Sequence, residues 1–229
     1  MLDRLINEIP RFFQYYTILL LLQAMATTLG MAVIGCTMGF AFGFVLVCLR
    51  QLTGWVFLPV RIVTIVYVDL FRRVPFLVIL YLVLFFIQAV NPNASLLSIA
   101  IIGICILSIA YTAEIIRAGF ESVPRQQIEA ATVMNFNRWQ ILRSVIIPQA
   151  WPVILPPAFA YMVGFIKDTA LVSQIGVLEL TSAGKILNNR GFSALLVFGT
   201  ILVLYFVLSY PLSRLGAFAE ARLAPPRNR

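Results

Sequence analysis

The sequence predicts an all-α, polytopic membrane protein: a helical bundle with about five transmembrane helices. Of its 229 residues, 61% are hydrophobic and only 11% are charged, and the mean hydropathy is +0.96. Soluble domains have about 45–50% apolar and about 25% charged residues, so this chain lacks the charge that a water-facing surface needs. Its apolar residues also form runs long enough to cross a bilayer, which takes about 20 residues.

The first predicted span covers residues 17–49, inside a stretch from Phe12 to Leu49 that holds no charged side chain. A secretory signal has a shorter apolar core and a small-residue cleavage site, so this run is not a signal. Residues 56–90 follow as one broken span, because Val74 precedes a proline and is therefore disfavoured in helical backbone. A separate crossing for the first half of this segment would give six spans instead of five.

Three more spans complete the predicted bundle. The third begins near Ala94, after the turn signal Asn91-Pro92-Asn93, the fourth begins near Trp151, and the fifth covers residues 191–213. Closely spaced prolines predict that the helix of the fourth span is discontinuous, as is common at transport sites. These prolines are Pro148, Pro152, Pro156 and Pro157.

Glycines at positions 35, 39 and 43 recur every four residues in the first span. Residues four apart share one face of a helix, and glycines there let another backbone approach closely. The approaching backbone belongs either to the same bundle or to a second subunit, and the spacing does not distinguish the two.

The basic residues predict the direction of the chain through the membrane. With the N-terminus outside, the outer side holds four basic residues, Arg4, Arg11, Lys185 and Arg190. The inner side holds ten: Arg50, Arg61, Arg117, Arg125, Arg138, Arg143, Arg214, Arg222, Arg227 and Arg229. Arginine and lysine concentrate in short cytoplasmic loops, so the N-terminus is expected outside and the C-terminus in the cytoplasm. Orientation, rather than nucleic-acid binding, explains the net charge of +8.

Missing residue types exclude several chemistries. The chain has no histidine, which excludes zinc sites built on imidazole and Ser-His-Asp triads. Its three cysteines, Cys36, Cys48 and Cys105, lie inside apolar runs at spacings unlike a metal or disulfide framework. Gly184-Lys185 lacks the upstream glycine and the following hydroxyl of a phosphate-binding loop. We therefore expect no metal site, no catalytic residue and no cofactor of its own.

Residues 118–148 form the longest hydrophilic segment, which we call the 118–148 loop. Ser122 is expected to cap a helix that runs from residue 125 to 134, and Asn135 follows where the helix must stop. Asparagine is the non-glycine residue that best tolerates left-handed backbone, so a tight turn is expected at this position.

A second short helix is predicted directly after that turn. Asn137 and Gln140 have the spacing of a capping box, and Pro148 is expected to end the helix. Ile128, Trp139 and Leu142 give the helix pair an apolar face. By composition alone, this pair could be an ordinary connector.

Four motifs in order resemble those of one family. Glu129-Ala130-Ala131, Asn135 six positions after Glu129, and Ile147-Pro148 resemble the "EAA" loop of the membrane subunits of bacterial ABC importers. Three further runs narrow the resemblance to permeases for polar amino acids, the histidine, glutamine, glutamate, arginine and opine group. They are Asp69-x-Phe71-Arg72-Arg73-Val74-Pro75, Ala113-Glu114-Ile115-Ile116-Arg117-Ala118-Gly119 and Lys167-Asp168-Thr169-Ala170-Leu171. Asn135 stands where the family usually has glycine.

The resemblance implies a fold and a set of partners. The fold would be that of type I ABC importers, a single permease domain over residues 1–229 with its core at 17–215. The 118–148 loop would dock on a separate ATPase subunit, present in two copies, which binds the ATP. Its coupling residues would be Glu129, Ala130, Ala131, Asn135 and Pro148. A second permease subunit, identical or homologous, and a periplasmic or surface amino-acid-binding protein would complete an importer in the bacterial inner membrane.

Charged residues at membrane depth are the candidates for the path of a polar amino acid, because such charges are costly and usually face a cavity or a partner. Lys167 and Asp168, followed by Thr169, form either a pore-lining or gate pair or, without a role in transport, a structural ion pair or an extracellular cap. Glu114 lies three residues before Arg117 on one helix face, so a local salt bridge is expected there. Arg72 either meets the carboxylate of the substrate or anchors the break at Pro75.

Other functions remain open at this point. Methionine or another small solute is an alternative substrate within the ABC class. A secondary carrier or channel that needs no ATPase is less favoured, because one half of the chain shows no inverted repeat of the other. A membrane-embedded enzyme is disfavoured by the absence of histidine and of a nucleophile motif.

Overall fold

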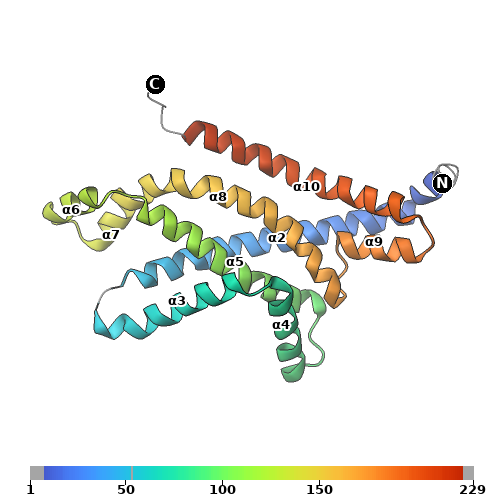
Figure 1. The fold of residues 1–229 in the computed structure, drawn as a ribbon, viewed down its shortest axis with the longest axis horizontal. Coiled ribbons are helices and arrows are strands. Elements are labelled where there is room, and N and C mark those ends of the chain that lie inside the picture. The colour runs from blue at the N-terminus through green and yellow to red at the C-terminus, as the bar shows by residue number, and fades with distance from the viewer. Residues whose placement is uncertain (1–7, 53, 224–229) are drawn as a thin grey trace. The chain divides into compact units, whose positions relative to one another are not determined.

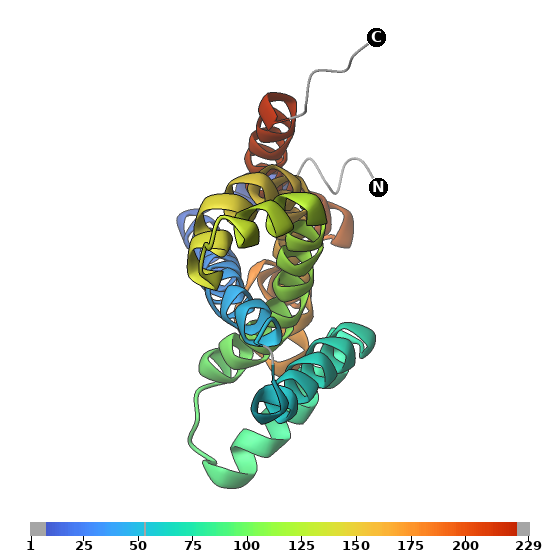
Figure 2. The same cartoon turned by 90° about the vertical axis from the view of Figure 1, so that its left-hand side faces the viewer.

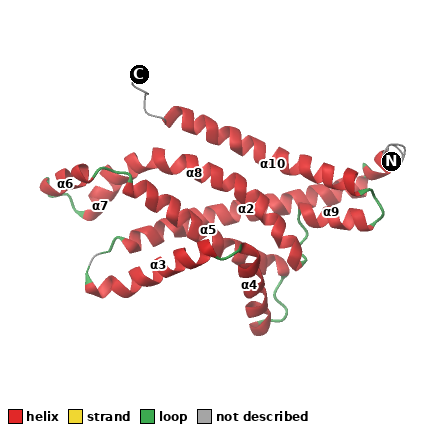
Figure 3. Cartoon of the chain, in the orientation of Figure 1, coloured by secondary structure: helices red, strands yellow, loops and turns green. Residues whose placement is uncertain are grey.

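The computed structural model describes residues 8–52 and 54–223, so Arg4, Arg227 and Arg229 of the charge comparison lie outside it. Within these ranges all regular structure is helical (Figure 3). Four helices are long and apolar enough to cross a membrane, and a broken helix pair brings the number of crossings to five if it counts as one span. The predicted class, an all-α bundle with about five transmembrane helices, is confirmed.

The helices follow one another with short connections (Figure 1). They are α2 (Tyr15–Arg50), η1 (Trp55–Phe57), α3 (Leu58–Arg73), α4 (Phe76–Val90), α5 (Leu96–Glu121), α6 (Arg125–Val133), α7 (Arg138–Ile141), η2 (Leu142–Ile146), α8 (Ile147–Asp168), η3 (Thr169–Ile175), α9 (Leu180–Asn189) and α10 (Ala194–Leu223). The predicted break at Val74 separates α3 from α4, as the following proline requires. The short helix α9 has no counterpart among the predicted spans.

The predicted discontinuity of the fourth span is wrong. One helix, α8, runs from Ile147 to Asp168 with Pro152, Pro156 and Pro157 inside it. Prolines are tolerated in membrane helices because neighbouring groups and local adjustments satisfy the freed backbone carbonyls. Nor does Pro148 end a helix.

The segment before Pro148 explains how the helix continues through it. η2 is one turn of π-helix, in which the N–H of Ile147 donates to the carbonyl of Leu142, five residues earlier. Bonds to the fifth preceding residue replace the α-helical bonds to the fourth in this turn. The replacement occurs just where the ring of Pro148 and its missing N–H would disrupt the α-helical bonds. The chain therefore passes from α7 into α8 without a break.

The chain divides into two compact units, each with its own core. Of the described residues, unit 1 comprises 8–36, 74–105 and 163–211, and unit 2 comprises 37–52, 54–73, 106–162 and 212–223. The core of unit 1 includes Phe12, Leu21, Leu180, Leu187 and Val197. That of unit 2 includes Val47, Ile116, Phe120, Leu142 and Ile154. The long helices α2, α5, α8 and α10 contribute to both units.

The glycine stripe of α2 packs inside the chain. In unit 2, a Cβ added at Gly43 would lie 2.8 Å from the backbone nitrogen of Ala113 in α5. Thr112 lies beside this contact, where its hydroxyl donates to the carbonyl of Gly39 at 2.6 Å. In unit 1, a Cβ at Gly35 would lie 2.5 Å from Ile104. Of the two interpretations of the stripe, packing within the bundle therefore applies at all three glycines.

Candidate functional site

The 118–148 loop forms a pair of short helices at one end of unit 2 (Figures 1 and 2). α6 ends in a left-handed turn at Asn135, whose φ is 59°. The N–H of Phe136 donates to the carbonyl of Ala131 and that of Asn135 to Thr132, both at 3.0 Å. These two bonds define a Schellman motif, which closes a helix when the next residue is left-handed. The prediction made for Asn135 is confirmed.

The second helix of the pair begins with the predicted capping box. The side chain of Asn137 accepts from the N–H of Gln140 at 2.9 Å, and the side chain of Gln140 accepts from the N–H of Asn137 at 2.8 Å. The predicted cap at Ser122 is wrong, because Pro124 occupies the cap position and the Ser122 hydroxyl donates to the carbonyl of Gly119. The loop is thus fixed at its turn and at the start of α7.

The loop is packed on unit 2 from inside and exposed on its outer side. Ala131, Ile141 and Leu142 are buried in the core of unit 2, and Ile128 packs against it, so the predicted apolar face of Ile128, Trp139 and Leu142 does not form one surface: only Trp139 is exposed. Glu129, Ala130 and Pro148 are exposed. The exposed apolar side chains are Val133, Met134 and Trp139, with exposed fractions of 83%, 68% and 61%. Beside them, the loop and the end of α2 line a groove of about 800 Å³.

Four charges of alternating sign join α3 to α5 in unit 2. Glu114 accepts two hydrogen bonds from Arg117, at 2.7 and 2.8 Å, and also pairs with Arg72 at 3.2 Å. Arg117 pairs in turn with Glu121. The predicted local salt bridge between Glu114 and Arg117 is confirmed.

The Arg72 side chain is held from a second direction. Its guanidinium lies over the ring of Tyr111, 5.8 Å from the centroid, and Tyr111 stacks on Tyr161 of α8. The Tyr111 hydroxyl also donates to the backbone carbonyl of Arg72 at 3.4 Å. These contacts fix the last turn of α3, just before the break at Pro75.

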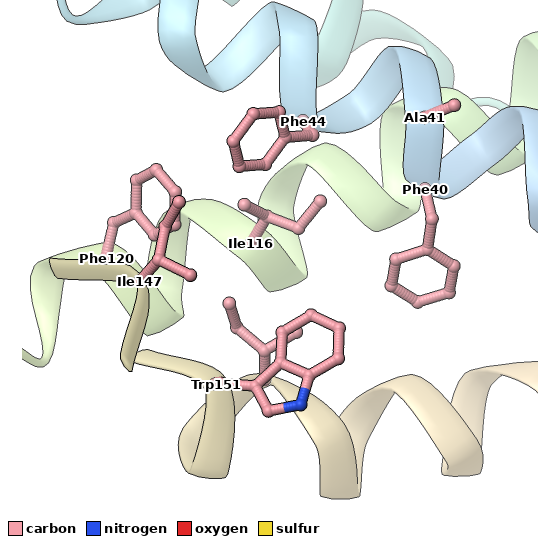
Figure 4. Close-up of a pocket in the computed structure, with 8 residues that line it drawn as sticks. Phe40, Ala41, Phe44, Ile116, Phe120, Ile147 and Trp151 are labelled. Atoms are coloured by element: carbon pink, nitrogen blue, oxygen red, sulfur yellow. The ribbon is translucent and has the colours of Figure 1, made fainter. Parts of the chain in front are cut away.

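Unit 2 also contains an apolar pocket of about 380 Å³ (Figure 4). It is lined by eight side chains of α2, α5 and α8: Phe40, Ala41, Phe44, Ile116, Phe120, Ile147, Trp151 and Ile154. Apart from the indole nitrogen of Trp151, these side chains offer no polar group. A polar or zwitterionic molecule would lose its hydration there without compensation, so this pocket does not suit such a solute.

The predicted residues at the end of α8 belong to unit 1. Lys167 and Asp168 are exposed and Thr169 is 1% exposed. In the described part of the chain, the ion pairs found join Arg72, Glu114, Arg117 and Glu121 and do not include Lys167 with Asp168. After Asp168 the chain continues as η3, a 3₁₀-helix of seven residues.

Sequence reasoning missed a buried carboxylate in unit 1. Glu179 is fully buried, caps α9 and accepts a hydrogen bond from the Tyr205 hydroxyl at 2.8 Å. Burial raises the pKa of Glu179 above its ordinary value, against the opposing effect of its hydrogen bonds and of Lys185. The available signal was a single acidic residue in the otherwise uncharged stretch from Thr169 to Gly184.

Residues 52–224 match the family described as "binding-protein-dependent transport system inner membrane component". This match covers about three quarters of the chain. The chain belongs to this family. It is therefore a membrane permease of a transport system that works with a binding protein, and the family resemblance of the four motifs is confirmed.

Individual relatives and structures agree with the family. The octopine transport system permease protein OccM of Rhizobium radiobacter is 31% identical over 94% of this chain and 90% of its own length. The glutamine permease GlnP of Escherichia coli (strain K12) is 30% identical over 89% of this chain and 93% of its own. The L-cystine permease TcyB of Bacillus subtilis (strain 168) is 33% identical over 81% of this chain and 80% of its own length.

Two solved structures share the fold. The crystal structure of an amino acid ABC transporter with histidines contains a chain that is 29% identical, with a TM-score of 0.81 over 89% of this chain and 94% of that one. A chain of the methionine transporter MetNI in an inward-facing conformation has a TM-score of 0.80 over 93% of this chain and 100% of that one, at 22% identity. The second likeness bears on the fold alone.

Proposed function

We propose that this chain is the membrane-spanning permease subunit of an ATP-driven ABC importer for polar amino acids. The family match and the amino-acid permeases among the relatives support this function, and a methionine importer or an ATPase-independent carrier has no comparable support. The observation that carries the proposal is the 118–148 loop, a braced helix pair with an exposed outer face. The N-terminus lies outside, and the loop and the C-terminus lie in the cytoplasm.

The loop transmits the movement of an ATPase subunit to the permease. Its turn and its capping box hold α6 and α7 in one relative arrangement, and Ala131 and Leu142 anchor both helices on unit 2. The outer face offers the Glu129 carboxylate next to Val133 and Met134. Exposed apolar side chains with polar groups at their rim are typical of a docking surface.

The five coupling residues then have different tasks. Glu129 and Ala130 are exposed and contact the ATPase, where the small alanine allows close approach. Ala131 packs inward, Asn135 makes the turn, and Pro148 follows the π turn at the root of α8.

The complete importer contains further subunits. One chain supplies half of the path, so a second permease, identical or homologous, pairs with it. Two ATPase subunits bind the ATP, and a periplasmic or surface binding protein delivers the amino acid. The chain acts as a single permease domain, with no catalytic group, metal or cofactor of its own.

The path residues are proposed from their charge and position. Lys167 and Asp168 are exposed at the end of a membrane helix and contact the amino acid, while Thr169 is buried and supports them. Arg72 and Glu114 hold each other beside the break at Pro75, which supports an anchoring role at the edge of the path.

Charge reversal at Glu129 tests the proposal. In a reconstituted complex of permease, ATPase and binding protein, Glu129→Lys should leave the permease in the membrane but abolish substrate-stimulated ATP hydrolysis and uptake. Glu220→Lys, which reverses an exposed charge in α10, is the matched control and should behave like the wild type. Wild-type stimulation and uptake with Glu129→Lys would refute the docking role.

The substrate class is tested separately. Uptake by the same vesicles is measured with a panel of basic, acidic and amide amino acids, octopine, cystine and methionine. Transport of methionine alone, or transport driven by an ion gradient without ATP, would contradict the proposed function.

A further inference from the structure

Glu179 in unit 1 does more than an N-cap requires. Its carboxylate accepts from the N–H of Ser182 at 2.6 Å and from the N–H of Thr181 at 2.9 Å, which caps α9. Serine, threonine, aspartate and asparagine are the residues that usually cap helices. The longer glutamate places the same carboxylate within reach of the Tyr205 hydroxyl on α10 as well. Burying a carboxylate is costly unless it is hydrogen-bonded, and these three donors compensate for that cost.

Tyr205 links this carboxylate to η3. Its hydroxyl lies 3.1 Å from the Thr181 hydroxyl, and it also interacts with the hydroxyl of Thr169, the first residue of η3. Thr169 itself donates to the carbonyl of Ile166 at 2.7 Å, so it is tied to the last turn of α8. The Tyr205 phenol therefore stands between the buried carboxylate and the end of α8.

A second polar contact holds η3 further along. The ammonium of Lys185 in α9 donates to the hydroxyl of Ser173 at 3.0 Å, and this hydroxyl donates to the carbonyl of Ala170 at 2.7 Å. α4 and α9 both pack against η3. The segment is thus held at its first and its fifth residue.

η3 needs such support because of its geometry. Runs of 3₁₀-helix longer than three or four residues are uncommon, since their hydrogen bonds are poorly aligned, and such stretches often mark hinges. η3 has seven residues and begins directly after Asp168. Asp168 is the residue directly before η3, so a shift of the first turn of η3 is passed on to the end of α8, where Lys167 and Asp168 lie.

We propose that Glu179, Tyr205 and Lys185 form a clamp that holds η3 and thereby positions Lys167 and Asp168 for the transported amino acid. The inference rests on the proposed function, in which these two residues line the path. None of the three clamp residues touches the substrate; they are positioning residues. Loosening the clamp weakens substrate affinity more than it slows the maximal rate.

Removal of single polar groups tests the clamp by transport kinetics. Tyr205→Phe deletes only the hydroxyl, and Lys185→Gln removes the ammonium and shortens the side chain. In vesicles that hold the whole importer, each should raise the KM of uptake about tenfold, the loss expected for one hydrogen bond to a charged group, with Vmax within about twofold. Lys185→Arg should restore a low KM. The control is Tyr210→Phe, an exposed tyrosine of the same helix that stacks on Phe206.

A chemical measurement tests the same clamp without transport. Asp168→Cys, in a chain whose three cysteines are replaced by alanine, is labelled with a membrane-impermeant maleimide. The labelling rate should change roughly threefold or more when Tyr205→Phe is added, and stay constant with Tyr210→Phe.

The outcomes separate the two proposals. If the wild-type importer takes up none of the amino acids, the proposed function fails, and the labelling rate still decides whether the clamp positions residue 168. If the wild type transports but both KM and labelling rate are unchanged in Tyr205→Phe, the clamp is refuted. A lower membrane yield of Tyr205→Phe with an unchanged KM would also overturn the clamp, because this result would show that Tyr205 contributes to folding but does not position the substrate-contacting residues.

Discussion

The turn at Asn135 offers the sharpest test of how the 118–148 loop works. Its φ of 59° lies in the left-handed region, and a Cβ in that region costs roughly 1–2 kcal/mol for most residues. Asparagine tolerates the region better than others, whereas a β-branched side chain tolerates it least. Asn135→Val should therefore disfavour the observed turn by about 1–2 kcal/mol, which is a factor of roughly 5–30 in the equilibrium constant between the turn and its alternatives.

Two hydrogen bonds and the relative placement of α6 and α7 depend on this turn. Without it, the bonds from Phe136 to Ala131 and from Asn135 to Thr132 are lost, and Glu129 no longer keeps its position relative to Trp139. Docking requires the observed arrangement, so substrate-stimulated ATP hydrolysis should fall with the population of the turn, by up to roughly the same factor.

The assay compares two substitutions at one position in the reconstituted complex. Asn135→Gly is the matched control, because glycine adopts left-handed backbone without a steric cost. We expect the glycine variant to keep near-wild-type stimulation and the valine variant to lose it. If valine is as active as glycine, the turn is not required. If Asn135→Gly loses as much stimulated ATP hydrolysis as Asn135→Val, the amide group of Asn135 is required and not its backbone conformation. That result would refute the reasoning.

Two further predictions concern the packing and the charges of unit 2. Gly43→Ala introduces a Cβ 2.8 Å from a backbone nitrogen of α5, so the overpacking should cost about 1–3 kcal/mol and lower the Tm of the purified protein by about 2–12 °C. Gly30→Ala, at an open position of the same helix, should not lower it, and equal melting of the two variants would contradict the close approach. Glu114→Gln leaves Arg72 and Arg117 without the carboxylate between them and should cost about 1–2 kcal/mol, since the pair is partly exposed. Thermal melts of Glu114→Gln and of the control Glu220→Gln measure this loss. Equal Tm values for the two variants would show that the ion pairs of Glu114 add no stability.

Local rules predicted the features that depend on a few neighbouring residues. The left-handed turn, the capping box and the break before Pro75 each follow from the backbone preferences of one or two residues. Hydropathy predicted the long helices because the bilayer sets their length and composition. The salt bridge between Glu114 and Arg117 followed from helix geometry alone.

Three of the failures involve partners distant in sequence or a shift in helix type. Pro148 was expected to end a helix, but one π turn before it changes the hydrogen-bond spacing. Leu142 was placed on an exposed face, but its side chain packs into the core of unit 2. Glu179 gains its role only when α10 brings Tyr205 beside α9, which no local pattern indicates.

The prolines of α8 have a consequence for its surroundings. Pro152, Pro156 and Pro157 have no N–H, so the carbonyls of Pro148, Pro152 and Val153 lack the donor that a regular helix would supply. Hydrocarbon offers no substitute, since an oxygen left without a donor there costs several kcal/mol. The strip of α8 that carries these oxygens must therefore face water or a donor on a neighbouring segment and not the lipid tails, and this requirement restricts the rotation of the helix about its own axis.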